Sequence, residues 1–145
     1  MLKTNYQHMK EGFKIVNNIS VPSDFSSIST VESLIDKICV DLGVNEDAYG
    51  NVLIAVTEAV NNAIQHGNQL NENLSVSLYV GDSSNEFCVN VQDEGKGFDF
   101  TNLPDPTSPE NIEKENGRGI FLMRSLADDV EFDDFGRSVN IYFTK

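Results

Sequence analysis

The apolar residues of this chain change their spacing along the sequence, and these changes limit what the chain can fold into. Between residues 29 and 67 they recur every third or fourth position, which is the period of an amphipathic helix. Between residues 74 and 93 they alternate with polar residues, which is the period of a strand with one buried face. Helices and strands therefore come from separate stretches, and each type offers one apolar face to a shared core.

Two helices are expected first, over residues 29–43 and 45–67. Ser29 and Glu32 have the spacing of a capping box, which indicates where the first helix begins, and Gly43 supplies its C-terminal stop. The second helix opens on Asn45 and acidic residues, as a helix N-terminus prefers, and it closes at Gly67.

Strands and one further helix complete the prediction. The helix is expected over residues 117–129, and residues 94–116, which lack periodicity, form the kind of long loop that is usually functional. Because the strands alternate apolar with polar residues, the helices should cover one sheet face, which predicts an α+β two-layer sandwich. The expected strands are residues 13–21, 74–80, 86–93, 130–132 and 138–143.

Composition excludes several classes of partner and compartment. A formal net charge of −13 and a pI near 4.3 argue against direct nucleic-acid binding or an anionic membrane as the main partner. No apolar run approaches the roughly 20 residues that span a bilayer, and no signal peptide is recognisable. Cys39 and Cys88 lack metal-ligand spacing, so we expect two core thiols in a reducing, cytoplasmic compartment. The 145 residues fit an N-terminal tail over 1–12 and one domain over 13–145.

The first polar motif is the stretch "EAVNNAIQHGN", residues 58–68. At about 100° per residue, Glu58 and Asn62 lie one above the other on the edge of the apolar helix face, with His66 a turn further on. A carboxylate can accept a proton, and an amide oxygen is a suitable ligand for Mg²⁺. The alternative is a helix C-terminus in which these polar groups only face water.

The second motif is "DEGKGFD", residues 93–99. Asp93 ends a strand, so its carboxylate stands at the rim of the sheet and can accept hydrogen bonds from a ligand amino group. Gly95 and Gly97 allow a tight turn and a close approach to a flat ligand. The alternative is an ordinary strand-ending turn, in which Asp and Gly are common.

The third motif is "NGRGI", residues 116–120, at the start of the last helix. Gly117 and Gly119 would expose backbone N–H groups at a helix N-terminus, which suits phosphate oxygens, and Arg118 adds a positive charge. The alternative is a flexible loop end. Lys96 and Lys114 are the other cations near this region.

Taken together and in this order, the three motifs resemble the nucleotide-binding boxes of the GHKL ATPase superfamily, whose members have the Bergerat ATP-binding fold. The resemblance covers residues 13–144 and implies helices on one face of a mixed, mostly antiparallel sheet. Within the superfamily, "TEAVNNAIQHGN" and "GRGIFLMRSLADDVEF" look most like the anti-sigma-factor serine kinases.

The resemblance implies a role for each motif residue. Glu58 is implied as the general base and Asn62 as a ligand of both Mg²⁺ and nucleotide, while Asp93 accepts a hydrogen bond from the adenine amino group. The glycines fall into two groups, with the adenine side lined by Gly95 and Gly97 and the phosphates held by Gly117 and Gly119. Residues 100–116 are implied as a lid over ATP. Transfer of the γ-phosphate would be assisted by a cation, and we assign this role to Arg118.

The implied function is that of an anti-sigma factor which is also an ATP- and Mg²⁺-dependent serine kinase. Such a protein binds a sigma factor and phosphorylates a serine of an anti-anti-sigma protein of the STAS type, and the resemblance allows a homodimer. Two alternatives stay open at this point. One is a non-enzymatic protein-binding module gated by ATP, and the other is a detached ATPase domain of the histidine-kinase type.

Overall fold

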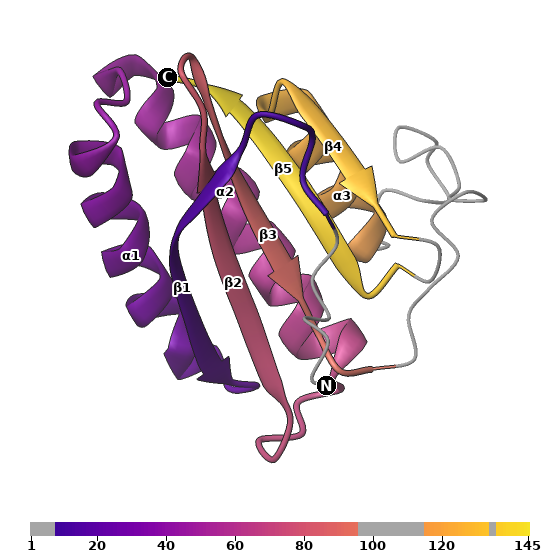
Figure 1. The fold of residues 1–145 in the computed structure, drawn as a ribbon. Coiled ribbons are helices and arrows are strands. Elements are labelled where there is room, and N and C mark those ends of the chain that lie inside the picture. Colours follow the sequence, from indigo (N-terminus) through magenta and orange to yellow (C-terminus); the bar gives the residue numbers. More distant parts are fainter. Residues whose placement is uncertain (1–7, 96–114, 134–135) are drawn as a thin grey trace.

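The strands pair into one antiparallel sheet (Figure 1). The computed structural model describes residues 8–95, 115–133 and 136–145, and only the backbone of residues 115–117. The strand order is β1-β2-β3-β5-β4, and every described pair is antiparallel, where the resemblance implied a mixed, mostly antiparallel sheet. The strands are β1 (Lys14–Pro22), β2 (Ser75–Asp82), β3 (Glu86–Gln92), β4 (Asp129–Phe132) and β5 (Ser138–Thr144).

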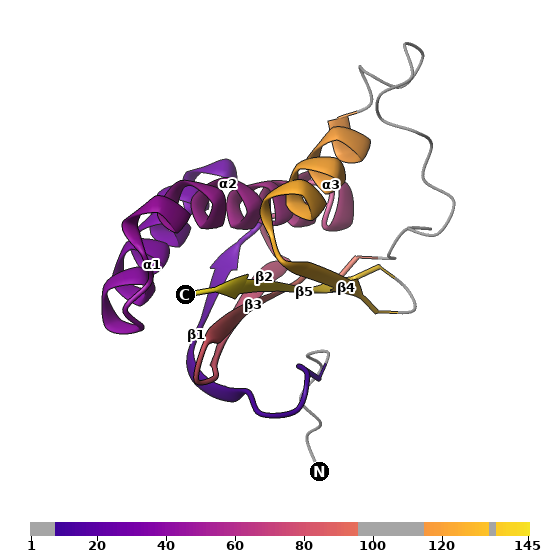
Figure 2. The ribbon, with the colours of Figure 1, turned by 90° about the horizontal axis from the view of Figure 1, so that it is seen from above.

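The helices of the described residues lie together on one face of this sheet, as Figure 2 shows. They are α1 (Ile28–Asp41), α2 (Glu46–Asn62) and α3 (Glu115–Leu126). A short 3₁₀ turn, Phe25–Ser27, precedes α1, and a π-helical turn, Ala63–Gly67, continues α2. The α+β two-layer sandwich predicted from the sequence is confirmed.

The core lies between the helices and the sheet, as the two periodicities require. The apolar face of α2 is fully covered, and alternate residues of the central strands point toward it. Complete burial of a valine, leucine or isoleucine side chain contributes about 1.5–3 kcal/mol to folding. Completely buried members of the core include Val31, Ile35, Val52, Ala55, Val56, Val60, Ile64, Val76, Leu78, Val80, Phe87 and Ile141. The two cysteines are also buried, as expected.

The other face of the sheet is polar, and the N-terminal segment crosses part of it. The backbone N–H of Lys10 donates to the Tyr142 hydroxyl at 2.8 Å, and its ammonium pairs with Asp129. The Asn140 amide, which is completely buried, donates to the carbonyl oxygen of His8 at 3.1 Å. The described part of the expected 1–12 tail therefore packs against β4 and β5.

Two predicted helix signals have different outcomes. The predicted capping box at Ser29 and Glu32 is wrong. The helix begins at Ile28 after the 3₁₀ turn, and the Ser29 hydroxyl donates to the Ser26 carbonyl. The stop at Gly43 is confirmed. Gly43 has a φ of 67°, a left-handed conformation that glycine adopts without a steric penalty.

Candidate functional site

The end of α2 departs from regular helix where the first polar motif lies. Over Ala63–Gly67 the helix widens into a π-helical turn, in which the Asn68 N–H donates to the Ala63 carbonyl at 2.8 Å. Such turns occur often at functional sites, because they redirect side chains without ending the helix. Glu58 and Asn62 are both half-buried just before it, on the margin of the apolar face as predicted.

Helix α3 brings the third motif onto the first. A Cβ atom on Gly119 would lie 2.9 Å from Oε2 of Glu58 and 3.0 Å from Nδ2 of Asn62, so the two helices approach here without a side chain between them. The Asn62 Nδ2 atom is buried and has no hydrogen-bond partner in the described structure. Leaving this buried N–H donor without a partner costs free energy, so a hydrogen-bond acceptor on a ligand would stabilise it.

The second motif faces the end of α2 from the sheet. Asp93 follows β3, its N–H donates to the Arg137 carbonyl at 2.9 Å, and its Oδ1 accepts from the Gly95 N–H at 2.8 Å. A Cβ on Gly67 would lie 2.4 Å from the Asp93 carboxylate, so Gly67 is needed for this close approach and has no positive φ. Gly67 thus ends the helical segment as predicted, but for a packing reason.

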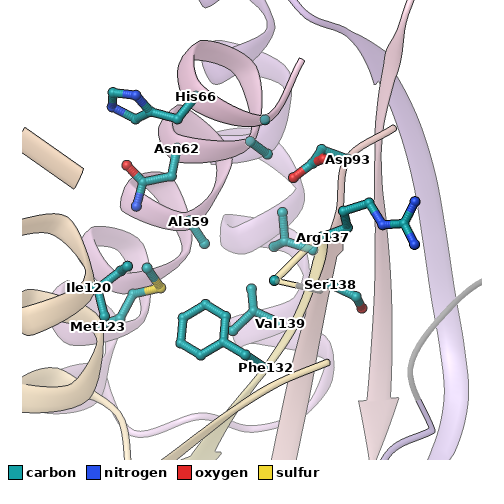
Figure 3. A pocket seen from close by; sticks show the side chains of 14 residues that line it. Ala59, Asn62, His66, Asp93, Ile120, Met123, Phe132, Arg137, Ser138 and Val139 are labelled. Atoms are coloured by element: carbon teal, nitrogen blue, oxygen red, sulfur yellow. The ribbon is translucent and has the colours of Figure 1, made fainter. Parts of the chain in front are cut away.

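A partly open pocket lies between these elements (Figure 3). The carboxylate of Asp93 points into it, Asn62 and His66 line it from the helix side, and the Arg137 guanidinium points away from its interior. Its walls are apolar, which suits a flat heterocyclic ring with a few polar edges. These walls are Ala59, Ala63, Val91, Ile120, Met123, Phe132 and Val139.

Burial of Asp93 raises the pKa of its carboxyl group to about 6. The largest cause is loss of hydration, which disfavours the charged form, and the nearby Asp133 adds to it. The Gly95 N–H and the positive charge of Arg137 act in the opposite direction. The protein groups around the carboxylate therefore compensate its charge poorly, and a hydrogen-bond donor on a ligand would stabilise it.

The predicted site residues have different places in the structure. Gly117 belongs to the first turn of α3, which begins two residues before the predicted boundary, and Arg118 is exposed beside Gly119. Gly97 and residues 100–114 of the expected lid lie outside the described residues. The fold brings Gly119 close to Glu58 and Asn62, and it brings Gly95 close to Asp93. Of these residues, Asn62 and Asp93 line the pocket.

Sequence reasoning missed several parts of the site. The aromatic and aliphatic walls from β4, β5 and α3 carry no motif, because strand and helix periodicity alone mark them as core residues. Arg137 belongs to the expected turn between the last two strands, and only the pairing of β3 with β5 brings it beside Asp93. Asn68 ended the quoted motif, but its partners come from distant segments.

We expect Gly95→Ala to weaken both the fold and nucleotide binding. A Cβ at this position would lie 1.9 Å from the carbonyl oxygen of Gly67, and neither backbone segment can move aside cheaply. Overpacking of this kind costs about 1–3 kcal/mol. Thermal unfolding should show a lower Tm, and calorimetry should show a loss of ATP affinity.

Gly50→Ala is the matched control. Gly50 lies in α2, and a Cβ atom added there would have nothing within 4 Å, so alanine should raise stability by about 0.5–1 kcal/mol through helix propensity. The turn formed by residues 93–95 is called the Asp93 turn below. A Gly95→Ala protein with wild-type Tm and wild-type ATP affinity would contradict the close packing of this turn on the end of the helix.

Two features are absent from the residues that the structure describes. No helix among them has the length and apolar composition that a membrane span requires. No group of three or more His, Cys, Asp and Glu side chains in the same ranges could hold a metal ion.

Comparison with known proteins agrees with this geometry. The family model described as a histidine kinase-like ATPase domain matches residues 21–143. A protein named serine-protein kinase RsbW from Oceanobacillus iheyensis is 25% identical over 122 residues, which cover 80% of this chain and 77% of that protein. Its namesake from Staphylococcus aureus (strain JH9) is 29% identical over 117 residues, or 76% and 74% of the two chains.

A solved structure also matches. The RsbU and RsbW domains of Rv1364c from Mycobacterium tuberculosis superpose with a TM-score of 0.57 at 13% identity, covering 88% of this chain and 30% of that longer one. At this identity the match supports the fold alone. The family match extends from the end of β1 to the end of β5 and includes all three polar motifs. The chain therefore belongs to the histidine kinase-like ATPase domain family.

Proposed function

We propose that the protein is an ATP-dependent serine kinase that also acts as an anti-sigma factor in the cytoplasm. The observation that carries this proposal is the close approach of Gly119 to both Glu58 and Asn62, together with the pocket that Asn62 and Asp93 both line. It joins the three motifs into one site with an apolar end and a polar end. The kinase names of the curated relatives support the same proposal.

The apolar end of the pocket suits adenine. Ala59, Met123 and Phe132 are among the residues that would contact the faces of the base, and Asp93 would accept a hydrogen bond from its amino group. Guanine has a carbonyl oxygen at that position, so it would place an acceptor against an acceptor. Asp93 therefore favours adenine over guanine.

The polar end suits the triphosphate and magnesium. Backbone N–H groups at the start of α3, which contains Gly117 and Gly119, would bind phosphate oxygens. Asn62 would hold Mg²⁺ through its side-chain oxygen, because an amide oxygen is a suitable ligand. Its buried Nδ2 group, which has no partner in the described structure, would donate to a phosphate oxygen. When bound, the ion neutralises charge on the phosphates.

Glu58 would serve the transfer itself. Its carboxylate would accept the proton of a substrate serine hydroxyl as the serine oxygen forms a bond to the γ-phosphorus. The bond between the γ-phosphorus and the bridging oxygen then breaks, and ADP leaves with that oxygen. Arg118, exposed one residue before Gly119, would contact the γ-phosphate and stabilise its charge.

The proposed protein substrate is an anti-anti-sigma protein of the STAS type, and the proposed binding partner is a sigma factor. The experiment incubates the purified chain with Mg-ATP and the STAS-type proteins of the same organism, and then identifies the phosphorylated residue by mass spectrometry. We expect phosphoserine on one of them. Pull-downs from native lysate with and without Mg-ATP should retain a sigma factor.

Other products would point to the alternatives. Phosphohistidine on the partner would indicate histidine-kinase chemistry. Tight ATP binding with nucleotide-dependent capture of a partner, but without transfer to any candidate, would indicate a binding module gated by ATP. Either result would contradict the proposed serine kinase.

A further inference from the structure

Asn68 lies directly after the π-helical turn, and its side chain is fully engaged. The residue is 2% exposed. Its Nδ2 group donates to the Ser23 hydroxyl at 2.7 Å and to the Ser75 carbonyl at 3.0 Å, and its Oδ1 accepts from the Glu94 N–H at 2.7 Å. One amide thus connects the end of the α2 segment to the ends of three strands.

The bond to Glu94 matters most for the site, because Glu94 stands between Asp93 and Gly95. A second hydrogen bond fixes the same turn, because the Glu94 carboxylate accepts from the Ser75 N–H at 2.6 Å. Neither Asn68 nor Glu94 lines the pocket. They therefore set the position of the turn without touching a ligand.

The Ser23 side of the cluster serves the strands. The Ser23 hydroxyl and its N–H both bond to the Leu74 carbonyl, at 2.8 and 3.1 Å, and this links the end of β1 to the start of β2. A buried and satisfied cluster of this kind favours one arrangement of its segments. The Asn68 amide extends that cluster to the backbone of the Asp93 turn, and the bond from the Ser75 N–H to the Glu94 carboxylate is a second link.

We propose that Asn68 is a positioning residue for adenine selectivity: its amide holds the Asp93 turn at a defined distance from Asn62 on α2. The inference rests on the proposed function, since it concerns the nucleotide of that same pocket. Asp93 can read the base only if its carboxylate stands within hydrogen-bond distance of the amino group while the phosphates lie near Asn62. A displacement of about 1 Å is enough to lose such a contact.

The test compares Asn68→Ala with Ser23→Ala by titrating the full chain with Mg-ATP and with Mg-GTP in a calorimeter. Asn68→Ala removes the acceptor for the Glu94 N–H, so we expect ATP affinity to fall about tenfold or more while GTP affinity changes little. The ratio of the two affinities therefore falls. Ser23→Ala removes a buried hydrogen bond of the same cluster and lowers the Tm, but it leaves the ratio unchanged.

Glu94→Ala is a second variant, which tests the same inference if Asn68→Ala does not fold. Glu94 is exposed, so its truncation should leave the chain folded while removing the second tie of the turn. It should lower the ATP-to-GTP ratio in the same direction, by a smaller factor. Circular dichroism and thermal unfolding identify the variants that are folded at the titration temperature.

The outcomes separate this inference from the proposed function. Wild-type protein that is folded and binds no ATP contradicts both. Wild-type protein that binds ATP, with a folded Asn68→Ala or Glu94→Ala variant of unchanged selectivity, overturns the role of Asn68 alone. Equal loss of selectivity in Ser23→Ala also overturns it, because the effect would then follow general destabilisation.

Discussion

Glu58→Gln should abolish phosphate transfer while ATP still binds. Glutamine has nearly the shape of glutamate but cannot take the proton of the serine hydroxyl, and general-base catalysis accounts for about 10²–10⁴-fold in rate. The substitution keeps a side chain against Gly119 and removes no partner of the Asp93 turn. The measurements are the rate of phosphoserine formation and the affinity for Mg-ATP.

Glu32→Gln provides the control for this change. Glu32 is exposed on α1, so the variant loses the same charge at a distance from the motifs, and both its transfer rate and its ATP affinity should match the wild type. Transfer that survives Glu58→Gln at the wild-type rate would remove Glu58 from the mechanism. A variant that no longer binds ATP would show that Glu58 contributes to binding instead.

Asp93→Asn should change nucleotide affinity and stability in opposite directions. A hydrogen bond to a charged acceptor is worth about 1.5–3 kcal/mol, so ATP affinity should fall by roughly 10- to 100-fold. Without nucleotide, the variant should nevertheless gain a few degrees in Tm at pH 8, because the substitution removes a poorly compensated buried charge. The partial exposure of Asp93 limits this gain. Calorimetry and thermal unfolding measure the two effects.

The stability difference should depend on pH in a defined way. The folded carboxyl group has a pKa raised from 3.8 to about 6, so it holds its proton more tightly than in the unfolded chain. The stability that this contributes to the wild type is complete below about pH 4 and is lost as the pH rises through 6. The advantage of Asp93→Asn should therefore appear between these values.

Asp41→Asn is the matched control for Asp93→Asn. Asp41 forms an exposed ion pair with Lys37 at 2.8 Å, and such a pair contributes only a few tenths of a kcal/mol. Its replacement should leave ATP affinity unchanged and produce no rise in stability between pH 4 and 6. A Tm for Asp93→Asn that follows the wild type at every pH would contradict the raised pKa of Asp93.

Much of the fold could be predicted because burial imposes simple periods on the sequence. The alternation in β2, β3 and β5 marks their core faces, and α2 repeats its apolar residues at helical spacing. The errors fall at element ends, where local hydrogen bonds compete. The 3₁₀ turn before α1 leaves Ser29 inside the helix, and α3 begins at Glu115 and ends at Leu126 rather than spanning 117–129.

The candidate site could be predicted only in part, because its motifs meet through tertiary contacts. Spacing placed Glu58 and Asn62 together on one helix edge, but the approach of Gly119 to both depends on how α3 packs against α2. The π-helical turn and the role of Gly67 also have no signal in the sequence. The role of Gly67 follows from the closeness of Asp93, whose place is set by the sheet.

Calorimetric titration of the intact chain with ATP and magnesium tests most directly whether the pocket between α2, α3 and the end of β3 binds an adenine nucleotide. We predict saturable binding of one nucleotide per chain, which weakens when GTP replaces ATP and when Asn replaces Asp93. Heats no larger than those of dilution, from wild-type protein that circular dichroism shows to be folded, would contradict the nucleotide site.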